Sequence, residues 1–167
     1  MDGAEGAGRR ITADYGRYLE DFQVGDVFEH RPGRTITQSD NISFSLLTMN
    51  RHPLHCDGHF AAQSEWGKPL VNSAFTIAVV MGMTVDDVSY KALANLGFDE
   101  LKLTAPVFPG DTLYARSEVL AARGSRSRPT QGIVTTRTEA YKPDGTVVMT
   151  FTRNSLIPKR GHGVGDA

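Results

Sequence analysis

Residues 74–85 read AFTIAVVMGMTV and form the longest apolar stretch of the chain. This length suits a buried helix and falls well short of the ~20 residues that a membrane-spanning helix needs. The expected helix is apolar on nearly every face, so other elements must surround it. Asn72 or Ser73, just before the stretch, is placed to cap its first turn. The stretch therefore predicts a central helix inside a globular domain and no membrane partner.

The segments that follow this stretch have the composition of β-strands, and the turn motifs FPGD, GSRSRP and KPDG separate them. Successive strands with short connections favour antiparallel pairing. The expected fold class is α+β, with an antiparallel sheet wrapped around the central apolar helix. The expected strands are NLGFDELKLTAPV, TLYARSEVLAAR, GIVTTRTEAYK and TVVMTFTRNSLI.

The half before the apolar stretch carries helix signals. Residues 26–37 read as an extended segment, and Asp40 is placed to cap a helix over residues 41–50. Pro53 ends that helix or starts a new one, and a further short helix is expected over residues 57–66. The chain ends are Gly-rich and polar, which is typical of mobile termini. We therefore expect flexible tails at 1–17 and 160–167 around one domain at 18–159.

Composition excludes several classes of protein. The 167 residues, 40% hydrophobic and 22% charged, fit one globular domain. A net charge of −1 provides no overall positive field for nucleic acid. The single cysteine, Cys56, excludes an internal disulfide and is expected to be a small buried side chain. The first residues, MDGAEGAGRR, lack the apolar run of a signal peptide, so we expect a cytoplasmic protein.

The stretch TMNRHPLHCDGHFA, residues 48–61, concentrates histidines in a short segment. A neutral imidazole titrates near physiological pH and can exchange a proton with water, which indicates acid/base chemistry. His52, His55 and His59 have spacings that would suit zinc on a continuous helix. Pro53 interrupts that helix and no Glu follows His55, so no metal site is expected.

The order of three motifs resembles the MaoC-like branch of the hotdog fold, the (R)-specific enoyl-CoA hydratases and dehydratases. The motifs are TITQSDNISFSLLTMNRHPLHCDGHFA, KPLVNSAFT and LTAPVFPGDTL, and the resemblance spans about residues 18–159. It implies a single hotdog domain and a homodimer or higher homo-oligomer, with sheets joined edge to edge and active sites at the interface. It also implies an acyl-CoA substrate, with coenzyme A as part of that substrate and no other cofactor.

The resemblance also assigns roles within the histidine stretch. The family's catalytic segment has an Asp, then Asn-Pro, then a His five residues after the Asp; here these positions read Asn50, His52-Pro53 and His55. His55 is then the acid/base. Asn50 can orient water but cannot take its proton, and a residue that only ends the preceding helix is the alternative for it. His52 would supply a second polar contact or simply face solvent.

Two further groups of residues gain roles from the resemblance. Asn72 and Ser73 stand where the family has His-Gly, and a backbone N–H at the helix start there stabilises the thioester enolate oxygen. Ser73 keeps that donor and Asn72 would contact the substrate, with plain N-capping as the alternative. The cluster ARGSRSRP would bind the phosphates of coenzyme A or form a solvated turn, and its arginines are Arg123, Arg126 and Arg128.

These observations predict reversible hydration of an α,β-unsaturated acyl-CoA thioester, a hydro-lyase reaction. The motifs MNRHPLH and PLVNS are similar to a subgroup that handles C5 dicarboxyl thioesters such as itaconyl-CoA or mesaconyl-CoA. Because the family carboxylate is absent at Asn50, a non-catalytic acyl-CoA-binding hotdog subunit is the alternative. A thioesterase is the third interpretation, since the same fold can direct water at a thioester carbonyl.

Overall fold

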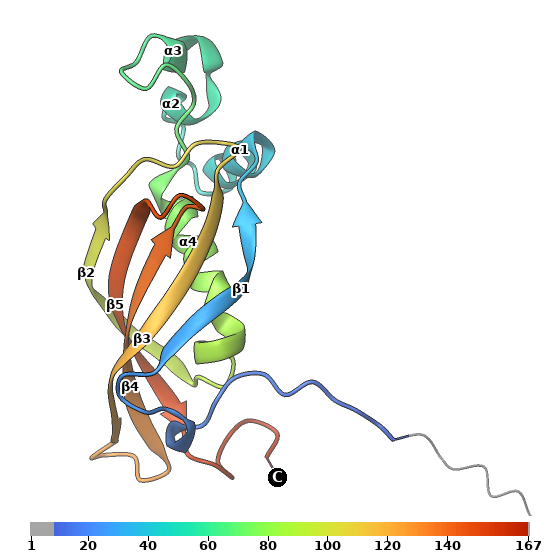
Figure 1. Ribbon diagram of the computed structural model, residues 1–167, viewed down its shortest axis with the longest axis vertical. Helices are drawn as coiled ribbons and strands as arrows, with labels where there is room; N and C mark the ends of the chain where they lie inside the picture. The colour runs from blue at the N-terminus through green and yellow to red at the C-terminus, as the bar shows by residue number, and fades with distance from the viewer. Residues whose placement is uncertain (1–8, 167) are drawn as a thin grey trace, which may run out of the picture.

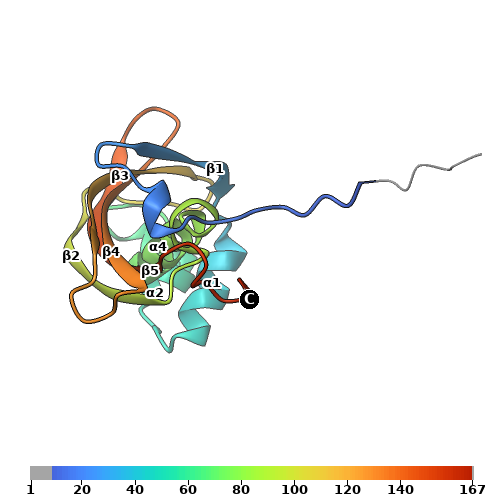
Figure 2. The ribbon, with the colours of Figure 1, turned by 90° about the horizontal axis from the view of Figure 1, so that it is seen from below.

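A five-stranded antiparallel sheet curls around helix α4 (Ser73–Met83) in the computed structural model, which describes residues 9–166 (Figures 1 and 2). The strand order is β1-β3-β4-β5-β2. The predicted α+β class, with an antiparallel sheet around a central apolar helix, is confirmed. Residues 1–8 and 167, which belong to the expected tails, lie outside the described range.

The sheet pairs each strand with its neighbour in antiparallel register. The segments expected to be strands all form them, and the extended segment before the first helix contains a further strand at the edge of the sheet. Along β4, burial alternates with a period of two, so one face of the strand points towards α4. The bounds are β1 Val27–Thr35, β2 Ala94–Leu103, β3 Thr112–Gly124, β4 Gln131–Tyr141 and β5 Val147–Pro158.

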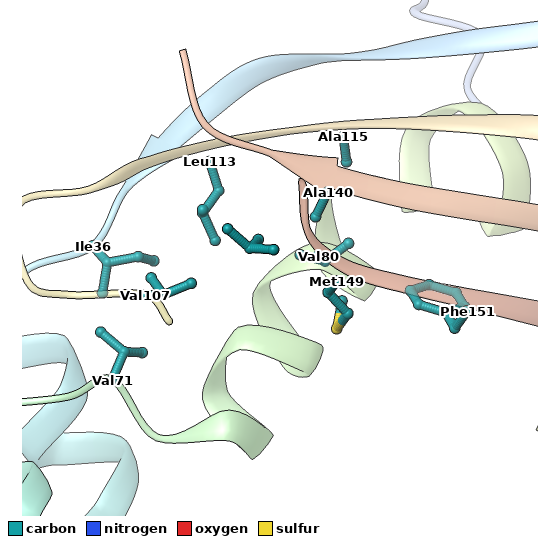
Figure 3. Close-up of a cluster of buried hydrophobic side chains, with 10 residues drawn as sticks. Ile36, Val71, Val80, Val107, Leu113, Ala115, Ala140, Met149 and Phe151 are labelled. Atoms are coloured by element: carbon teal, nitrogen blue, oxygen red, sulfur yellow. The ribbon is translucent and has the colours of Figure 1, made fainter. Parts of the chain in front are cut away.

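Helix α4 begins at Ser73 because Asn72 caps it. The Asn72 Oδ1 accepts a hydrogen bond from the N–H of Ala74 at 3.0 Å. Val80 of α4 lies among Ala140, Met149 and Phe151 of the sheet, within the main hydrophobic cluster (Figure 3). The sheet therefore covers one side of α4.

The helices before α4 differ from the expected ones at their ends. Helix α1 (Gln38–Leu47) is capped by Thr37, three residues before the expected cap, and Asp40 closes a reciprocal capping box. The short helix expected over 57–66 is two helices, α2 (Pro53–Cys56) and α3 (Gly58–Ala62). Asp57 caps α3 by accepting from the N–H of Phe60 at 3.0 Å. Two short turns of helix, η1 (Leu19–Asp21) and η2 (Val85–Ser89), complete the elements.

The C-terminal segment lies beside η1 (Figure 1). The backbone N–H of Arg160 donates to Glu20 Oε2 at 3.1 Å, and its guanidinium pairs with Asp21. The Tyr18 hydroxyl donates to Asp166. These contacts tie residues 160–166 to the domain, while the flexibility expected for both tails stays a prediction.

Buried polar side chains cross the inner face of the sheet between two hydrophobic clusters. One cluster contains Phe151 and the other contains Ile157, and Arg153 lies between them on β5. Buried polar residues also interrupt the apolar inner face of the sheet on β1, β3 and β4. We call this set the polar belt: His30, Ser117, Thr136, Thr138 and Arg153.

His30 connects one half of the polar belt. Its Nδ1 donates to Asp87 Oδ2 at 2.8 Å, because a carboxylate can only accept. Its Nε2 therefore accepts from Ser117 Oγ at 2.8 Å, and Ser117 Oγ lies 2.8 Å from Thr138 Oγ1. A neutral His30 imidazole therefore satisfies every hydrogen bond in the series from Asp87 to Thr138.

Burial, more than any other influence, keeps the pKa of His30 below its ordinary value of about 6.5. The unfolded chain then binds a proton at His30 at higher pH than the native protein does. The free energy of unfolding should therefore fall as the pH drops below about 6.5. We expect His30→Gln to weaken this pH dependence, as measured by urea unfolding at about pH 7.5 and pH 5.5. His59→Gln, at an exposed position, is the matched control; identical pH dependence in all three proteins would contradict the prediction.

Candidate active site

Asn41, fully buried on α1, joins the segments of the candidate site. Its Nδ2 donates to the carbonyl oxygens of His55 and Leu70, each at 3.1 Å. Its Oδ1 accepts from the N–H of Asn72 at 2.8 Å. One amide thus fixes α1, α2 and the start of α4 relative to one another.

His55 on α2 is held in one tautomer. Its Nδ1 lies 2.8 Å from the Leu70 carbonyl oxygen, which can only accept, so Nδ1 carries the proton. In the neutral imidazole Nε2 is then unprotonated and free to act as a base. The ring is partly buried, so it keeps access to the surface of the site.

Asn50 shapes the turn that leads into α2. Its Oδ1 accepts from the N–H of His52 at 3.1 Å, which leaves the Nδ2 group as its available donor. The exposed His52 caps α2, because its Nδ1 accepts from the N–H of Leu54 at 3.2 Å. Its ring centroid lies 5.8 Å from that of His55. The hydrogen bonds of Asn50 and His52 therefore shape the turn that leads to His55.

A cavity of about 290 Å³ opens beside the start of α4. Ser73 and Leu70 line it, together with Trp66, Thr76 and residues 103–107, which are the end of β2 and the segment after it. The Ser73 N–H has no acceptor within residues 9–166, so it is available to a ligand oxygen. Leu70 links the two parts of the site, since its carbonyl oxygen accepts from His55 and the residue lines the cavity.

Asn72 is 2% exposed, and its side chain is bonded within the protein. Its Nδ2 donates to Ser45 Oγ at 3.1 Å, and its Oδ1 caps α4. These bonds favour the capping alternative, and the contact between Asn72 and substrate stays a prediction. Sequence reasoning missed Asn41 and Ser45, although two polar residues four positions apart on the inner face of α1 are a signal of a buried polar contact.

The arginine cluster lies at the other end of the sheet. Arg126 and Arg128 are in the connection between β3 and β4, and Arg123 is the penultimate residue of β3; all three are exposed. Figure 1 shows this connection at the bottom of the molecule and α2 and α3 at the top. Within one chain, therefore, the cluster is not brought to His55, and its phosphate contact stays a prediction.

The remaining expectations concern metal, thiol and membrane. Among residues 9–166 no group of three or more His, Cys, Asp or Glu side chains is arranged to hold a metal ion. Cys56 is exposed, so the expectation of a buried thiol is wrong. No helix in the described part of the chain is long and apolar enough to cross a membrane.

A curled sheet around an apolar helix, with a histidine segment over the start of that helix, defines a MaoC-like hotdog domain. A family model described as mesaconyl-CoA hydratase matches residues 5–167. The chain belongs to this mesaconyl-CoA hydratase family, and the MaoC-like resemblance is confirmed.

Known proteins support this assignment. Mesaconyl-CoA hydratase of Cereibacter sphaeroides is 33% identical over 150 residues, which cover 90% of this chain and 43% of the relative. The structure of a MaoC domain dehydratase from Chloroflexus aurantiacus has 30% identity and a TM-score of 0.85, over 90% of this chain and 43% of that one. A double hotdog protein of Mycobacterium tuberculosis has 26% identity and a TM-score of 0.77, over 86% of this chain and 44% of that one. The chain thus spans less than half the length of these proteins.

The hydrogen bonds of the Asn41 side chain predict that replacing its amide with a carboxylate lowers the stability of the fold. Asn41→Asp removes the Nδ2 donor and places a carboxylate against the carbonyl oxygens of His55 and Leu70. Loss of buried bonds of this kind should lower the free energy of unfolding by about 1–3 kcal/mol in urea titrations. Ser43→Ala, exposed on the same helix, should change it by less than about 0.5 kcal/mol. Similar values for the two variants would show that Asn41 does not hold the site together.

Proposed function

We propose that this chain is one hotdog unit of a hydratase that reversibly adds water across the double bond of an α,β-unsaturated acyl-CoA, with C5 dicarboxyl thioesters such as mesaconyl-CoA as the substrate class. The observation that carries the proposal is the hydrogen bond from His55 Nδ1 to the Leu70 carbonyl at 2.8 Å. It leaves Nε2 unprotonated as a base, and the same Leu70 lines the cavity beside the helix start at which an oxyanion would be stabilised.

In this mechanism His55 Nε2 takes a proton from water as the water oxygen bonds to the β-carbon. The electron pair of the double bond shifts towards the thioester, and the Ser73 N–H donates to the resulting enolate oxygen. His55 then returns the proton to the α-carbon. Water is consumed and nothing is oxidised or reduced, so the proposal requires no cofactor beyond the coenzyme A of the substrate.

Asn50 would assist without titrating. Because its Oδ1 is bonded to the His52 N–H, the group that it can offer is an N–H donor, either to the water oxygen or to the thioester carbonyl. This role replaces the carboxylate that the resemblance places there. The proton transfer is consequently assigned to His55 alone.

We also propose that two copies join edge to edge through β2. This strand pairs with β5 on one side only, and it carries three exposed leucines, Leu96, Leu101 and Leu103. On α4, the small residues Ala74, Ala78 and Gly82 form an exposed stripe at helical spacing. A second copy on this side would cover both the exposed edge of β2 and the α4 stripe. A cytoplasmic location stays a prediction.

An antiparallel pair of β2 strands would reverse the long axis of the second copy. The arginine cluster of that copy would then lie at the same end as α2 of the first copy, where the phosphates of a bound coenzyme A could meet it. A non-catalytic acyl-CoA-binding subunit and a thioesterase are the other candidate functions, favoured only by the missing carboxylate at Asn50.

Incubation with mesaconyl-CoA and crotonyl-CoA, followed by mass spectrometry, tests the function. A hydratase yields the thioester plus water, a thioesterase yields free coenzyme A, and a binding protein leaves the thioester unchanged. His55→Ala should lower the hydration rate by roughly 10²–10⁴-fold, since no carboxylate at position 50 can replace the imidazole. Asn50→Ala should cost less, and Asn50→Asp shows whether a carboxylate is tolerated. Wild-type turnover in His55→Ala would disprove the mechanism.

The arginine cluster makes a separate prediction. Replacing both Arg126 and Arg128 with Ala should raise KM for the CoA ester more than it lowers kcat, because phosphate anchoring is shared by ground and transition states. The double variant of Arg9 and Arg10, basic residues of the N-terminal segment, is the charge-matched control. An unchanged KM would assign the cluster to the solvated surface.

A further inference from the structure

A second cavity, of about 330 Å³, lies at the opposite end of α4 from Ser73. The last turn of α4, η2, the start of β2 and the inner face of β5 enclose it. Its wall holds one cation, Arg153, and three neutral polar side chains, Ser89, Asn95 and Ser155. The rest of the wall is small or apolar, and no Asp or Glu of the described segment contributes to it.

Arg153 has no counterion among residues 9–166. It is 3% exposed, and its Nη2 donates to Thr84 Oγ1 at 3.1 Å. Its Nε is buried and has no partner, and neither has the buried Oγ1 of Thr136, directly opposite on β4. No carboxylate forms an ion pair with Arg153 in the part of the chain that the structure describes.

An unpaired guanidinium in this position is costly. Burial holds the pKa of Arg153 below its ordinary value, yet a guanidinium stays charged at neutral pH. Removing one such charge from water is strongly unfavourable unless an anion and hydrogen bonds offset the loss of hydration. The carbonyl end of α4 supplies partial negative charge, but it leaves Nε without an acceptor. The cavity therefore has the charge and the donors to bind an anion.

We propose that this cavity binds a carboxylate, and that the carboxylate is the free end of a dicarboxyl acyl thioester held at the active site of a second copy of the chain. This inference rests on the proposed function. It supplies the cationic group that a C5 dicarboxyl substrate needs: the guanidinium binds the carboxylate, the neutral donors complete its hydrogen bonds, and Met81 and Val85 contact the acyl carbons.

The length of α4 separates Arg153 from Ser73 of its own chain, so a second copy must hold the thioester. The 11 residues of α4 span about 16 Å, which is longer than a five-carbon acyl group, so Arg153 cannot reach a thioester at Ser73 of its own chain. Ala94 and Asn95 at the start of β2 line this cavity, whereas Leu103 at the end of β2 lines the cavity beside Ser73. In an antiparallel pair of β2 strands, the start of one strand lies beside the end of the other. Each Arg153 would then face the partner's active site.

Substrate selectivity tests the role of Arg153. We expect Arg153→Gln to lower the ratio of kcat/KM for mesaconyl-CoA to kcat/KM for crotonyl-CoA by roughly 10- to 100-fold, the usual effect of losing a charge-assisted hydrogen bond, because crotonyl-CoA has no free carboxylate. Asn95→Asp, which adds a negative charge at the mouth of the cavity, should lower the same ratio without removing Arg153. The same Arg-to-Gln change at Arg137, exposed on the outer face of the sheet, is the control. Equal losses on both thioesters would overturn the inference and leave the hydratase proposal standing.

Mixing two variants that are each impaired on mesaconyl-CoA tests the contribution of the second copy. When His55→Ala and Arg153→Gln chains are combined, one site of each mixed dimer has both His55 and Arg153, but only if they come from different copies. Hydration of mesaconyl-CoA should therefore rise towards half the wild-type rate in the mixed dimers. No recovery, with mixed dimers verified by native mass spectrometry, would place both residues in one chain and overturn the shared site.

Binding distinguishes failure of the inference from failure of the proposed function. If the wild-type protein hydrates neither thioester, the hydratase proposal fails, and titration calorimetry with succinyl-CoA and butyryl-CoA still decides the cavity. A preference for succinyl-CoA that Arg153→Gln abolishes would support the carboxylate site, and equal affinities would reject it. Binding of free succinate that depends on Arg153, without preference between the two esters, would assign the cavity to a free dicarboxylate and overturn its assignment to the substrate.

Discussion

Helix α4 has no polar face, and the rest of the molecule is arranged around the need to keep water from it. The sheet covers one side through Val80 and its neighbours, and α1 closes over the start of the helix through Asn41. One chain leaves the stripe at Ala78 and Gly82 exposed. The same demand that curls the sheet therefore also favours a second hotdog unit, because burying this stripe would complete the shell.

The two ends of α4 provide opposite electrostatic environments. Its start offers the free N–H of Ser73, which suits a developing negative charge, and its end holds the guanidinium of Arg153 through Thr84. The apolar middle of the helix separates these two ends by its whole length. A site built from both ends thus needs two helices running in opposite directions, which the proposed edge-to-edge pair would provide.

The sequence was sufficient where the signal is local. Apolar length predicted α4, and alternating composition with turn motifs predicted β2 to β5. The cap of α1 was placed at Asp40 because both members of a capping box are good caps, and only the backbone shows that Thr37 comes first. The tautomer of His55 and the role of Asn41 depend on the Leu70 carbonyl, which is 15 and 29 residues away. Arg153 was missed because an arginine within an alternating strand usually faces solvent.

At position 50, the hydrogen bond that shapes the loop does not depend on whether the side chain can carry a proton. Its side-chain oxygen serves the backbone of His52, and an aspartate oxygen can accept the same bond. An exchange between the two residues by a single mutation would leave the loop in place and alter only whether this position can carry a proton. Descendants of one ancestral protein could therefore gain or lose a second acid/base group without first evolving a new loop.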